Sequence, residues 1–511
     1  MPIRITGLNS GLDTDSIVKE LVSAYSIKKD KYVKAQTKLE WKQDAWKEMN
    51  SKIYGFYSKT LSNIKMLGNF TSKKTTTISD STKAKISADS TVTNGTQKLK
   101  VNALASAGYL TGQELKKANG DKITNDTMLG ELGVRDGSLQ LKVGGETKTV
   151  NVTADMKISD LTKALKEQGI ATANFDATQQ RLFLNSASGV ENDFEFVATD
   201  QSSLDILNGL GLATKDNYEQ VHGTGSAPTD KTFANKTDAT NAVIELNGAV
   251  FESATNEFAI NGLNITAMGV SEEMTITTAT DVDGIYNMVK DFLKEYNEVM
   301  NSMEKAFNAA SAKGYEPLTD DEKSEMSDKE VEKWESKIKD SILRRDDTLS
   351  SIMSTMSMAM SRTFEVDGKT YSLSSFGIST AGYFNRTENE SYALHIDGDP
   401  DDTTSSANAD KLRKAIEQDP DTFASFFTQM ATGLYEDLHE KMGSTELSSV
   451  FTVYNDKQMK IEYDEYTETI KKWEEKLEQI EESYYKKFAA MEKALATLQS
   501  QQNSLSSLLG G

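Results

Sequence analysis

Apolar and aromatic residues recur at every seventh position along residues 456–511 of the 511-residue chain. A seven-residue spacing places one residue of each heptad on the same helix face, and no proline interrupts this segment. The row comprises Tyr463, Ile470, Leu477, Tyr484, Met491, Leu498 and Leu505. The pattern predicts one long helix with a coiled-coil seam.

A companion row supports this seam over its first half. It comprises Met459, Tyr466, Trp473 and Ile480. Lys487, Ala494 and Gln501 occupy the next positions of the row, while Phe488 and Leu495 continue the apolar stripe one position later. Polar residues at core positions weaken a coiled coil, so we expect Lys487 and Gln501 to let this helix rearrange at modest cost.

The charge of the helix changes along its length. Half of residues 456–493 are charged, whereas residues 494–511 carry no charged side chain. A neutral Leu/Gln/Ser surface can pack among other helices without desolvating ions. Two interpretations stay open, a weakly ordered terminus or a tip that enters a protein assembly.

The segment from Asp13 to Leu67 shows a second coiled-coil pattern. Asp13 or Thr14 can cap a helix whose first turn holds Asp15 near the positive end of the dipole. Its apolar rows comprise Leu21, Tyr25, Tyr32, Ala35, Leu39, Trp46, Met49, Ile53 and Phe56. Long helices gain stability mainly by packing their stripes, so we expect the two terminal helices to be antiparallel neighbours or to await partners.

Strand patterns replace helical ones between the two terminal segments. Alternating apolar positions flank turn dipeptides such as Asn94-Gly95, Gly144-Gly145 and Asn247-Gly248, which favour hairpins. One helix is expected from Ser159 to Gly169. Residues 215–241, rich in Gly, Thr and Asp, are expected to form an exposed linker or loop.

Helical periodicity returns at Asp281. A cluster of methionines at positions 353, 356, 358 and 360 could serve a metal-thioether or adaptable binding site, but core filling in a helical bundle is the favoured interpretation. A short hairpin is expected within residues 364–396, followed by two more helices.

These patterns predict an α+β multidomain fold with long terminal coiled-coil helices, a helical bundle and inserted β-rich head domains. The expected parts are an N-terminal leg helix (1–68), an inner head (69–107 and 236–280), an outer head (108–235), a helical bundle with a hairpin (281–455) and a C-terminal leg helix (456–511).

Composition narrows the classes of partner. The net charge of −21, from 78 acidic and 57 basic residues, repels phosphate backbones, so nucleic acid is not expected. No apolar run approaches the roughly 20 residues of a membrane span. The chain has no cysteine, which excludes disulfides and thiolate metal sites. Residues 1–11 lack signal-peptide features, which predicts a cytoplasmic protein or export without a cleaved signal.

Two fragments resemble catalytic motifs but lack a required residue. Gly368-Lys369-Thr370 ends like a phosphate loop, yet Thr363 stands in place of the leading glycine. His439-Glu440 begins a zinc-protease helix motif, but Gly443 replaces the second histidine.

A third fragment has the spacing of a calcium loop. Asp397, Asp399 and Asp401 alternate as calcium ligands do, but Asp402 replaces the turn glycine and Asn408 the bidentate glutamate. A solvated acidic loop is the favoured interpretation. We therefore expect no enzymatic activity, no cofactor and no metal.

Residues 10–18, SGLDTDSIV, resemble the opening signature of the flagellar filament cap protein family, also called hook-associated protein 2 or FliD. Residues 137–196 are similar to a flagellin hook insertion motif. Other stretches that resemble the family follow in order at 98–107 (KLKVNALASA), 277–301, 373–380, 411–427 and 488–498 (FAAMEKALATL).

The resemblance implies a secreted structural protein at the distal tip of the bacterial flagellum. Family members form a ring homo-oligomer in which head domains make a plate and helical legs contact the filament tip. This implies that the protein promotes flagellin polymerisation and prevents flagellin leakage. The implied partners are further copies of the chain, flagellin, the hook–filament junction proteins, a flagellar export chaperone and the type III export apparatus, without membrane insertion.

The heptad rows and the resemblance together nominate assembly residues on both legs. They are Leu21, Tyr25, Tyr32, Leu39, Trp46, Ile53, Tyr463, Ile470, Trp473, Leu477, Ile480, Tyr484, Phe488, Met491, Leu495, Leu498 and Leu505. We expect residues 456–493 to pair with the N-terminal helix and residues 494–511 to dock at the filament end.

Other functions stay open. Flagellin and other hook-associated proteins also place helical ends around a β-rich centre, but their ends do not resemble residues 10–18 and 488–495. A tip-exposed adhesin could bind mucin or host glycans through residues 108–235. A hydrolase in the centre is the enzymatic alternative, although no nucleophile is paired with a base there.

Overall fold

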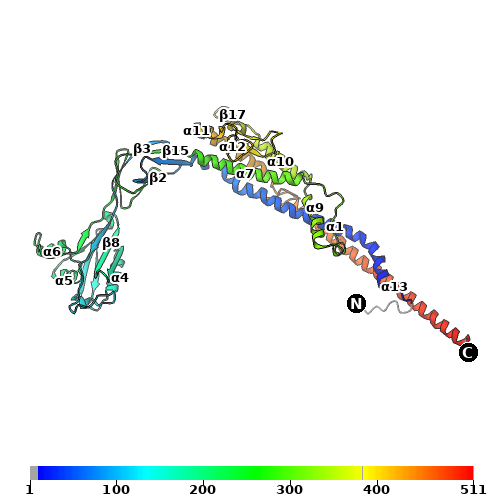
Figure 1. The fold of residues 1–511 in the computed structure, drawn as a ribbon, viewed down its shortest axis with the longest axis horizontal. Coiled ribbons are helices and arrows are strands. Elements are labelled where there is room, and N and C mark those ends of the chain that lie inside the picture. The colour runs from blue at the N-terminus through cyan, green and yellow to red at the C-terminus, as the bar shows by residue number, and fades with distance from the viewer. Residues whose placement is uncertain (1–9, 383, 510–511) are drawn as a thin grey trace. The chain divides into compact units, whose positions relative to one another are not determined.

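The computed structural model of the protein describes residues 10–382 and 384–509 (Figure 1). The chain divides into two units. Met1–Thr71 and Val282–Gly511 form a helical unit, and Ser72–Asp281 form a β-rich unit. Long terminal helices with inserted β-sheets confirm the predicted α+β multidomain class.

The first helix of the helical unit, α1, spans Thr14–Gly55. Asp13 caps it, because its carboxylate accepts hydrogen bonds from the Ser16 hydroxyl at 2.6 Å and the Ser16 amide at 3.1 Å. These bonds hold the pKa of Asp13 below its ordinary value. A π-helix, η1 (Phe56–Leu61), continues α1 and was not expected from the sequence.

The rest of the helical unit is a bundle that carries two small hairpins. Its helices are α2 (Ser62–Ile64), α3 (Gly68–Thr71), α7 (Val282–Phe307), α8 (Asp320–Ser324), α9 (Asp328–Asp340), α10 (Asp347–Met360), α11 (Lys411–Gln418), α12 (Pro420–Lys441) and α13 (Asp456–Leu509). The hairpins pair β16 (Phe364–Val366) with β17 (Lys369–Tyr371), and β18 (Ile378–Thr380) with β19 (Leu394–Ile396).

Aromatic residues from distant segments fill the core of the bundle. The Phe292 ring lies 5.7 Å from Phe56 and 5.5 Å from Phe427. The methionine cluster of α10 packs in the same core, where Met353, Met356 and Met360 are buried and Met358 is exposed. This confirms core filling as the role of the three buried methionines.

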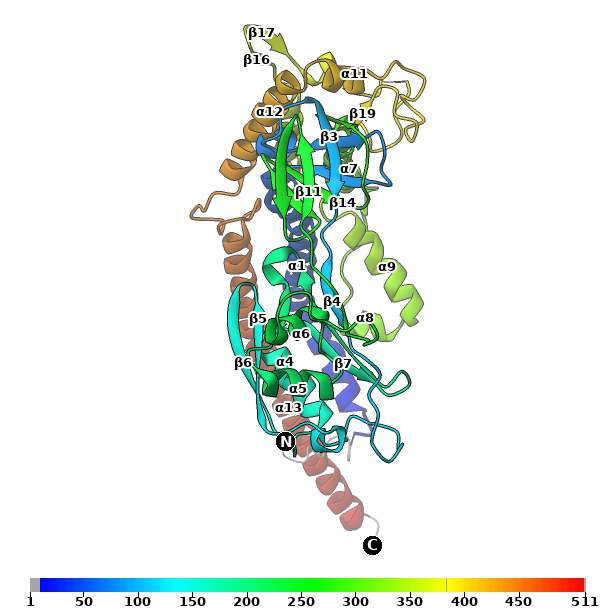
Figure 2. The same cartoon turned by 90° about the vertical axis from the view of Figure 1, so that its left-hand side faces the viewer.

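The β-rich unit contains two groups of sheets, each with its own core. In the inner group, a five-stranded sheet has the order β1 (Lys74–Ile78), β15 (Met274–Thr280), β3 (Gly95–Ala103), β11 (Ala242–Leu246) and β12 (Ala249–Ser253). A three-stranded sheet has the order β13 (Glu257–Ile260), β14 (Leu263–Ala267) and β2 (Ala84–Ala88). Figure 2 shows β3 and β11 side by side.

The outer group lies between β3 and β11 in the sequence. One sheet has the order β10 (Asn235–Thr237), β4 (Ala107–Thr111), β8 (Arg181–Ser188) and β7 (Thr172–Asp176). The other has the order β6 (Glu146–Val152), β5 (Gly137–Val143) and β9 (Phe194–Val197). Three helices accompany them, α4 (Ile158–Glu167), α5 (Gln201–Gly209) and α6 (Lys215–His222).

Two local predictions for the outer group were wrong. Residues 215–241, expected as an exposed linker or loop, contain α6 and β10. The Asn217 side chain is 1% exposed and donates to the Phe196 carbonyl, so a buried tertiary contact orders a polar segment. The helix expected to start at a Ser159 cap starts earlier, because the Asp160 carboxylate accepts from the Lys157 amide at 3.2 Å.

We expect Asn217→Ala to destabilise α6 by about 1–3 kcal/mol, because it leaves buried polar groups without partners. Hydrogen–deuterium exchange of residues 215–222 measures this change. The control Lys215→Ala removes an exposed side chain of the same helix and should stay within about 0.5 kcal/mol of the parent. Equal exchange in the two variants would contradict a structural role for Asn217.

Candidate assembly surface on the terminal helices

Helices α1 and α13 lie side by side and run antiparallel within the helical unit (Figure 1). The Gln36 amide donates to the Thr467 hydroxyl at 2.6 Å. The Tyr32 and Tyr466 rings lie 6.4 Å apart. Residue numbers fall along α1 as they rise along α13, since Lys28 lies 5.6 Å from the Trp473 ring. The predicted pairing of the two legs is therefore present within one chain.

The base of this helix pair is tightly held. Trp46, which is 2% exposed, stacks on Tyr454 with ring centroids 5.4 Å apart and an interplanar angle of 11°. The Asn50 side chain accepts from the Val453 amide at 2.9 Å and donates to the Phe451 carbonyl at 3.1 Å. These contacts set the register in which α13 meets α1.

Burial of the nominated residues decreases away from the base. On α1, Leu39, Trp46 and Ile53 are buried, Tyr32 is half-buried, and Leu21 and Tyr25 are exposed. The nominated residues of α13 that are half-buried are Tyr463, Ile470, Trp473, Leu477, Ile480, Tyr484, Phe488, Met491 and Leu495. Leu498 and Leu505 are each 60% exposed. Within one chain, the pair thus leaves much of its apolar stripe accessible.

The stripe of α13 changes register after Tyr484. Phe488 and Leu495 are half-buried, whereas Lys487 and Ala494 are exposed. The interpretation of Lys487 as a polar core position was wrong, since the stripe passes beside it and its ammonium lies 5.2 Å from the Tyr484 ring. An α-helix has 3.6 residues per turn, so its apolar face drifts away from a strict seven-residue repeat. The four-residue step from Tyr484 to Phe488 compensates for this drift and keeps the stripe in contact with the neighbouring helix.

Sequence reasoning missed the contacts at the amino-terminal end of α1. Thr14 and Val18 are each 1% exposed, although the heptad rows nominated Leu21 and Tyr25 instead. The Ser10 hydroxyl donates to Glu492, which is itself 9% exposed. Thr14 and Val18 are four residues apart and therefore lie on the same helix face, which was the sequence signal for their burial.

A second surface of α1 is covered by the segment that contains α8 and α9. The Lys34 ammonium lies 2.7 Å from Glu322, and the Lys42 ammonium lies 3.0 Å from Asp346. Burial opposes ionisation of Glu322, but the hydrogen bonds from Lys34 and Thr319 and the positive charge of Lys34 together outweigh it and lower the pKa of Glu322. Glu322 in α8 and Asp346, the N-cap of α10, therefore each pair with a lysine of α1.

The calcium-like aspartates are neutralised by lysine side chains. The Lys290 ammonium lies 2.7 Å from Asp399 and 2.7 Å from Asp401. Lys411 lies 3.4 Å from Asp397. Among the described residues, no group of acidic or histidine side chains could hold a metal ion.

The other two motif-like fragments have structural contacts. The His439 Nδ1 atom lies 2.9 Å from the Tyr57 hydroxyl and the His439 ring stacks on Tyr435, so it packs α12 against η1. Gly368, with φ of 75°, forms the turn of the hairpin between β16 and β17.

No described helix is long and apolar enough to cross a membrane.

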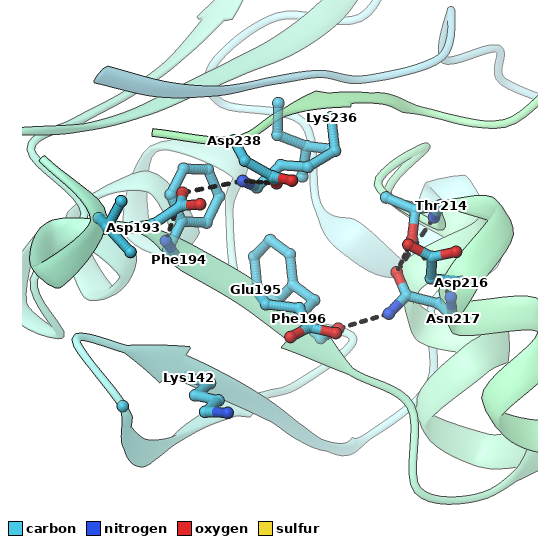
Figure 3. A pocket seen from close by; sticks show the side chains of 13 residues that line it. Lys142, Asp193, Phe194, Glu195, Phe196, Thr214, Asp216, Asn217, Lys236 and Asp238 are labelled. Carbon is cyan, nitrogen blue, oxygen red and sulfur yellow. Dashed lines mark hydrogen bonds and ion pairs between the residues drawn. The ribbon is translucent and has the colours of Figure 1, made fainter. Parts of the chain in front are cut away.

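The outer group of sheets contains a pocket of about 440 Å³ (Figure 3). Its Lys236 ammonium lies 2.8 Å from Asp193 and 2.9 Å from Asp238, and 5.2 Å from the Phe194 ring. At the opposite side, the Asn217 side chain donates to the Phe196 carbonyl and accepts from the Thr214 hydroxyl at 2.9 Å (Figure 3). Lys236 is thus already paired with carboxylates, and these contacts connect β9 to the segment around β10.

The half-covered stripe and the uncharged, exposed end of α13 define a coiled-coil assembly protein. Family models for the N-terminus and the C-terminus of flagellar hook-associated protein 2 match residues 10–108 and 239–500. The chain belongs to the flagellar hook-associated protein 2 family, which confirms the resemblance seen in its sequence.

Individual relatives agree with this family. The chain is 23% identical to flagellar hook-associated protein 2 of Halalkalibacterium halodurans, over 98% of this chain and 99% of that protein. It is 29% identical to A-type flagellar hook-associated protein 2 of Pseudomonas aeruginosa, over 58% of this chain and 62% of that protein. These names refer to the flagellum, so they do not support the adhesin alternative.

Among solved structures, the D1-D2-D3 domains of the flagellar cap protein FliD from Escherichia coli align with a TM-score of 0.46. The sequence identity is 16%, and the alignment covers 76% of this chain and 95% of that chain.

We expect Phe488→Glu to loosen the outer part of the helix pair, because it places a charge on the half-buried stripe. Exchange of the α1 amides from residue 14 to 25 should become about tenfold faster, equivalent to about 1.4 kcal/mol. The matched control Lys487→Glu changes the adjacent exposed position and should leave this exchange unchanged. A similar response to both substitutions would rule out the register that places Phe488 in the stripe.

The contact between Lys34 and Glu322 should weaken in acid. Because the pKa of Glu322 is lowered on folding, its contribution is present above the unfolded pKa of about 4.3 and is lost as the pH falls through the folded value. Glu322→Gln imitates the protonated state at neutral pH. An ion pair of this kind contributes roughly 0.5–1 kcal/mol. Glu322→Gln should therefore accelerate hydrogen–deuterium exchange of the α8 and α9 amides by about two- to fivefold.

Glu325→Gln is the matched control for this experiment, because it removes the same charge from an exposed side chain of the same segment. It should leave the exchange of α8 and α9 unchanged. If Glu322→Gln behaved like this control, the ion pair would not hold the segment against α1.

Proposed function

We propose that this protein caps the distal end of the bacterial flagellar filament, where it promotes flagellin polymerisation and prevents leakage of flagellin. The observation that carries this proposal is family membership at both ends of the chain, through residues 10–108 and 239–500. These regions include α1 and α13 as far as residue 500, so the match covers most of the assembly surface.

The outer end of α13 is the proposed docking element for the filament. Ser10, just ahead of α1, contacts Glu492, so α13 continues past the first turn of α1. Residues 494–509 would extend about 24 Å further at 1.5 Å per residue. This segment has no charge and exposes Leu498 and Leu505, so flagellin helices could cover it without desolvating ions.

The half-buried stripe suits a cap that must shift as each flagellin subunit is added. Side chains that remain half-accessible in one chain lose less stabilisation on separation than fully buried ones. The tightly stacked Trp46 and Tyr454 can hold the base of the leg while its outer part exchanges contacts. This mechanism replaces the one based on Lys487, because that residue lies outside the stripe.

The proposed partners follow from this role. Further copies of the chain would form a ring whose β-rich heads make a plate, and flagellin and the hook–filament junction proteins would meet the legs. We also propose secretion through the flagellar type III apparatus with an export chaperone. The absence of cysteine supports this route, because no disulfide has to be avoided or broken when the chain passes unfolded.

Complementation of a strain that lacks its own cap protein tests the proposal. The parent chain should restore filaments and retain flagellin on the cell. The double variant Leu498→Glu, Leu505→Glu should be exported and folded but should release flagellin into the medium, because charges now occupy the docking surface. Filament length and secreted flagellin are the measurements.

A control adds the same two charges at neighbouring exposed positions, through Gln499→Glu and Gln502→Glu. It should behave like the parent chain if the leucines make the contact. Normal capping by the leucine variant would refute the docking role of the α13 end. Flagellin leakage from cells that export the parent chain would refute the cap function itself.

A further inference from the structure

The sequence Asn-Gly occurs five times in the chain, and this dipeptide can modify itself. The glycine nitrogen attacks the Cγ atom of the preceding asparagine side chain, ammonia leaves, and a cyclic succinimide forms. Water then opens the ring to give aspartate or isoaspartate, so the reaction needs no other reagent. The five asparagines are Asn94, Asn119, Asn208, Asn247 and Asn261.

Asn94 and Asn247 are each held at both ends of the side-chain amide by residues of neighbouring strands. The Asn94 oxygen accepts from the Lys74 ammonium at 2.8 Å, and its nitrogen donates to the Thr280 hydroxyl at 3.1 Å. The Asn247 oxygen accepts from the Lys98 amide at 2.9 Å, and its nitrogen donates to Gln97 at 3.2 Å. Such bonds must break before Cγ can turn toward the glycine nitrogen.

Asn119 and Asn208 are held in other ways. Asn119 pairs with Asp121, and the attacking amide of Gly120 donates to the Lys117 carbonyl at 3.0 Å. Asn208 lies in the last turn of α5 and accepts from the Lys231 ammonium at 3.1 Å. A helical backbone keeps the glycine nitrogen away from the side chain of the preceding residue.

Asn261 differs from the other four. It occupies the exposed two-residue turn between β13 and β14, and its side chain makes no hydrogen bond to any described residue. Its φ of 47° and the φ of 81° at Gly262 are the positive values that such a turn requires. We propose that Asn261 is the preferred site of spontaneous deamidation in this protein.

The two products would affect the turn differently. Aspartate tolerates the positive φ of asparagine, so it can keep the hairpin. Isoaspartate adds a methylene group to the main chain of a two-residue turn whose Gly262 carbonyl accepts from the Asp89 amide at 2.9 Å. Gly262 also lies close to the side chains of Asp89, Thr91 and Val92, since a Cβ atom built on it would lie within 2.8 Å of each, so a longer main chain at this turn would disturb these contacts. Isoaspartate should therefore loosen β13 and β14.

Incubation of the full-length protein in water labelled with heavy oxygen tests this site. Ring opening incorporates the label, and peptide mapping by mass spectrometry then compares the five asparagines. The peptide that contains Asn261 should become labelled first, and Asn261→Gln should abolish its labelling. Exchange of residues 257–267 should rise in the isoaspartate fraction.

Lys74→Ala provides a matched control, because it removes the hydrogen-bond donor to the Asn94 oxygen. This variant should accelerate labelling at Asn94 and leave Asn261 unchanged. Equal labelling of all five asparagines would show that the dipeptide alone determines reactivity and would overturn the proposal. Faster labelling of any of the other four in the parent chain would overturn it as well.

Discussion

The antiparallel packing of α1 against α13 is the interaction on which the helical unit depends. At its base, Trp46 stacks on Tyr454 and Asn50 binds the backbone at 451 and 453, so the two helices have one defined register. Farther out, the stripe of α13 is only half-buried. Contacts there stabilise the pair less than those at the base because they remove less apolar surface from water, although Thr14 and Val18 are buried again at the amino-terminal end of α1.

This uneven burial links the structure to an assembly function. If a single chain buried its whole apolar stripe, no apolar surface would remain for a partner. If the stripe were exposed at the base, the two helices would lose their defined register. The exposed leucines lie where α13 carries no charge, and the charged part of α13 remains a solvated surface. In the proposed cap function, this surface would meet the filament subunits.

The role of each local motif depends on its contacts with residues that are distant in the sequence. The aspartates of the calcium-like loop face Lys290 from α7, and His439 meets the hydroxyl of Tyr57 in η1. Asn-Gly dipeptides that are identical in sequence differ in whether another strand holds their side chains. In each case, a partner far away in the sequence occupies the group that the motif would use for chemistry.

The sequence by itself determined the long terminal helices, the β-rich centre, the fold class and the family, because helix and strand periodicity are local properties of the chain. It also identified the α13 stripe, including its shift to Phe488 and Leu495. Only the tertiary structure decided that Val18 rather than Leu21 is buried, that α8 and α9 cover α1, and that residues 215–222 are helical. These outcomes depend on which distant surfaces meet, since burial against a neighbour can outweigh the local preference of a segment.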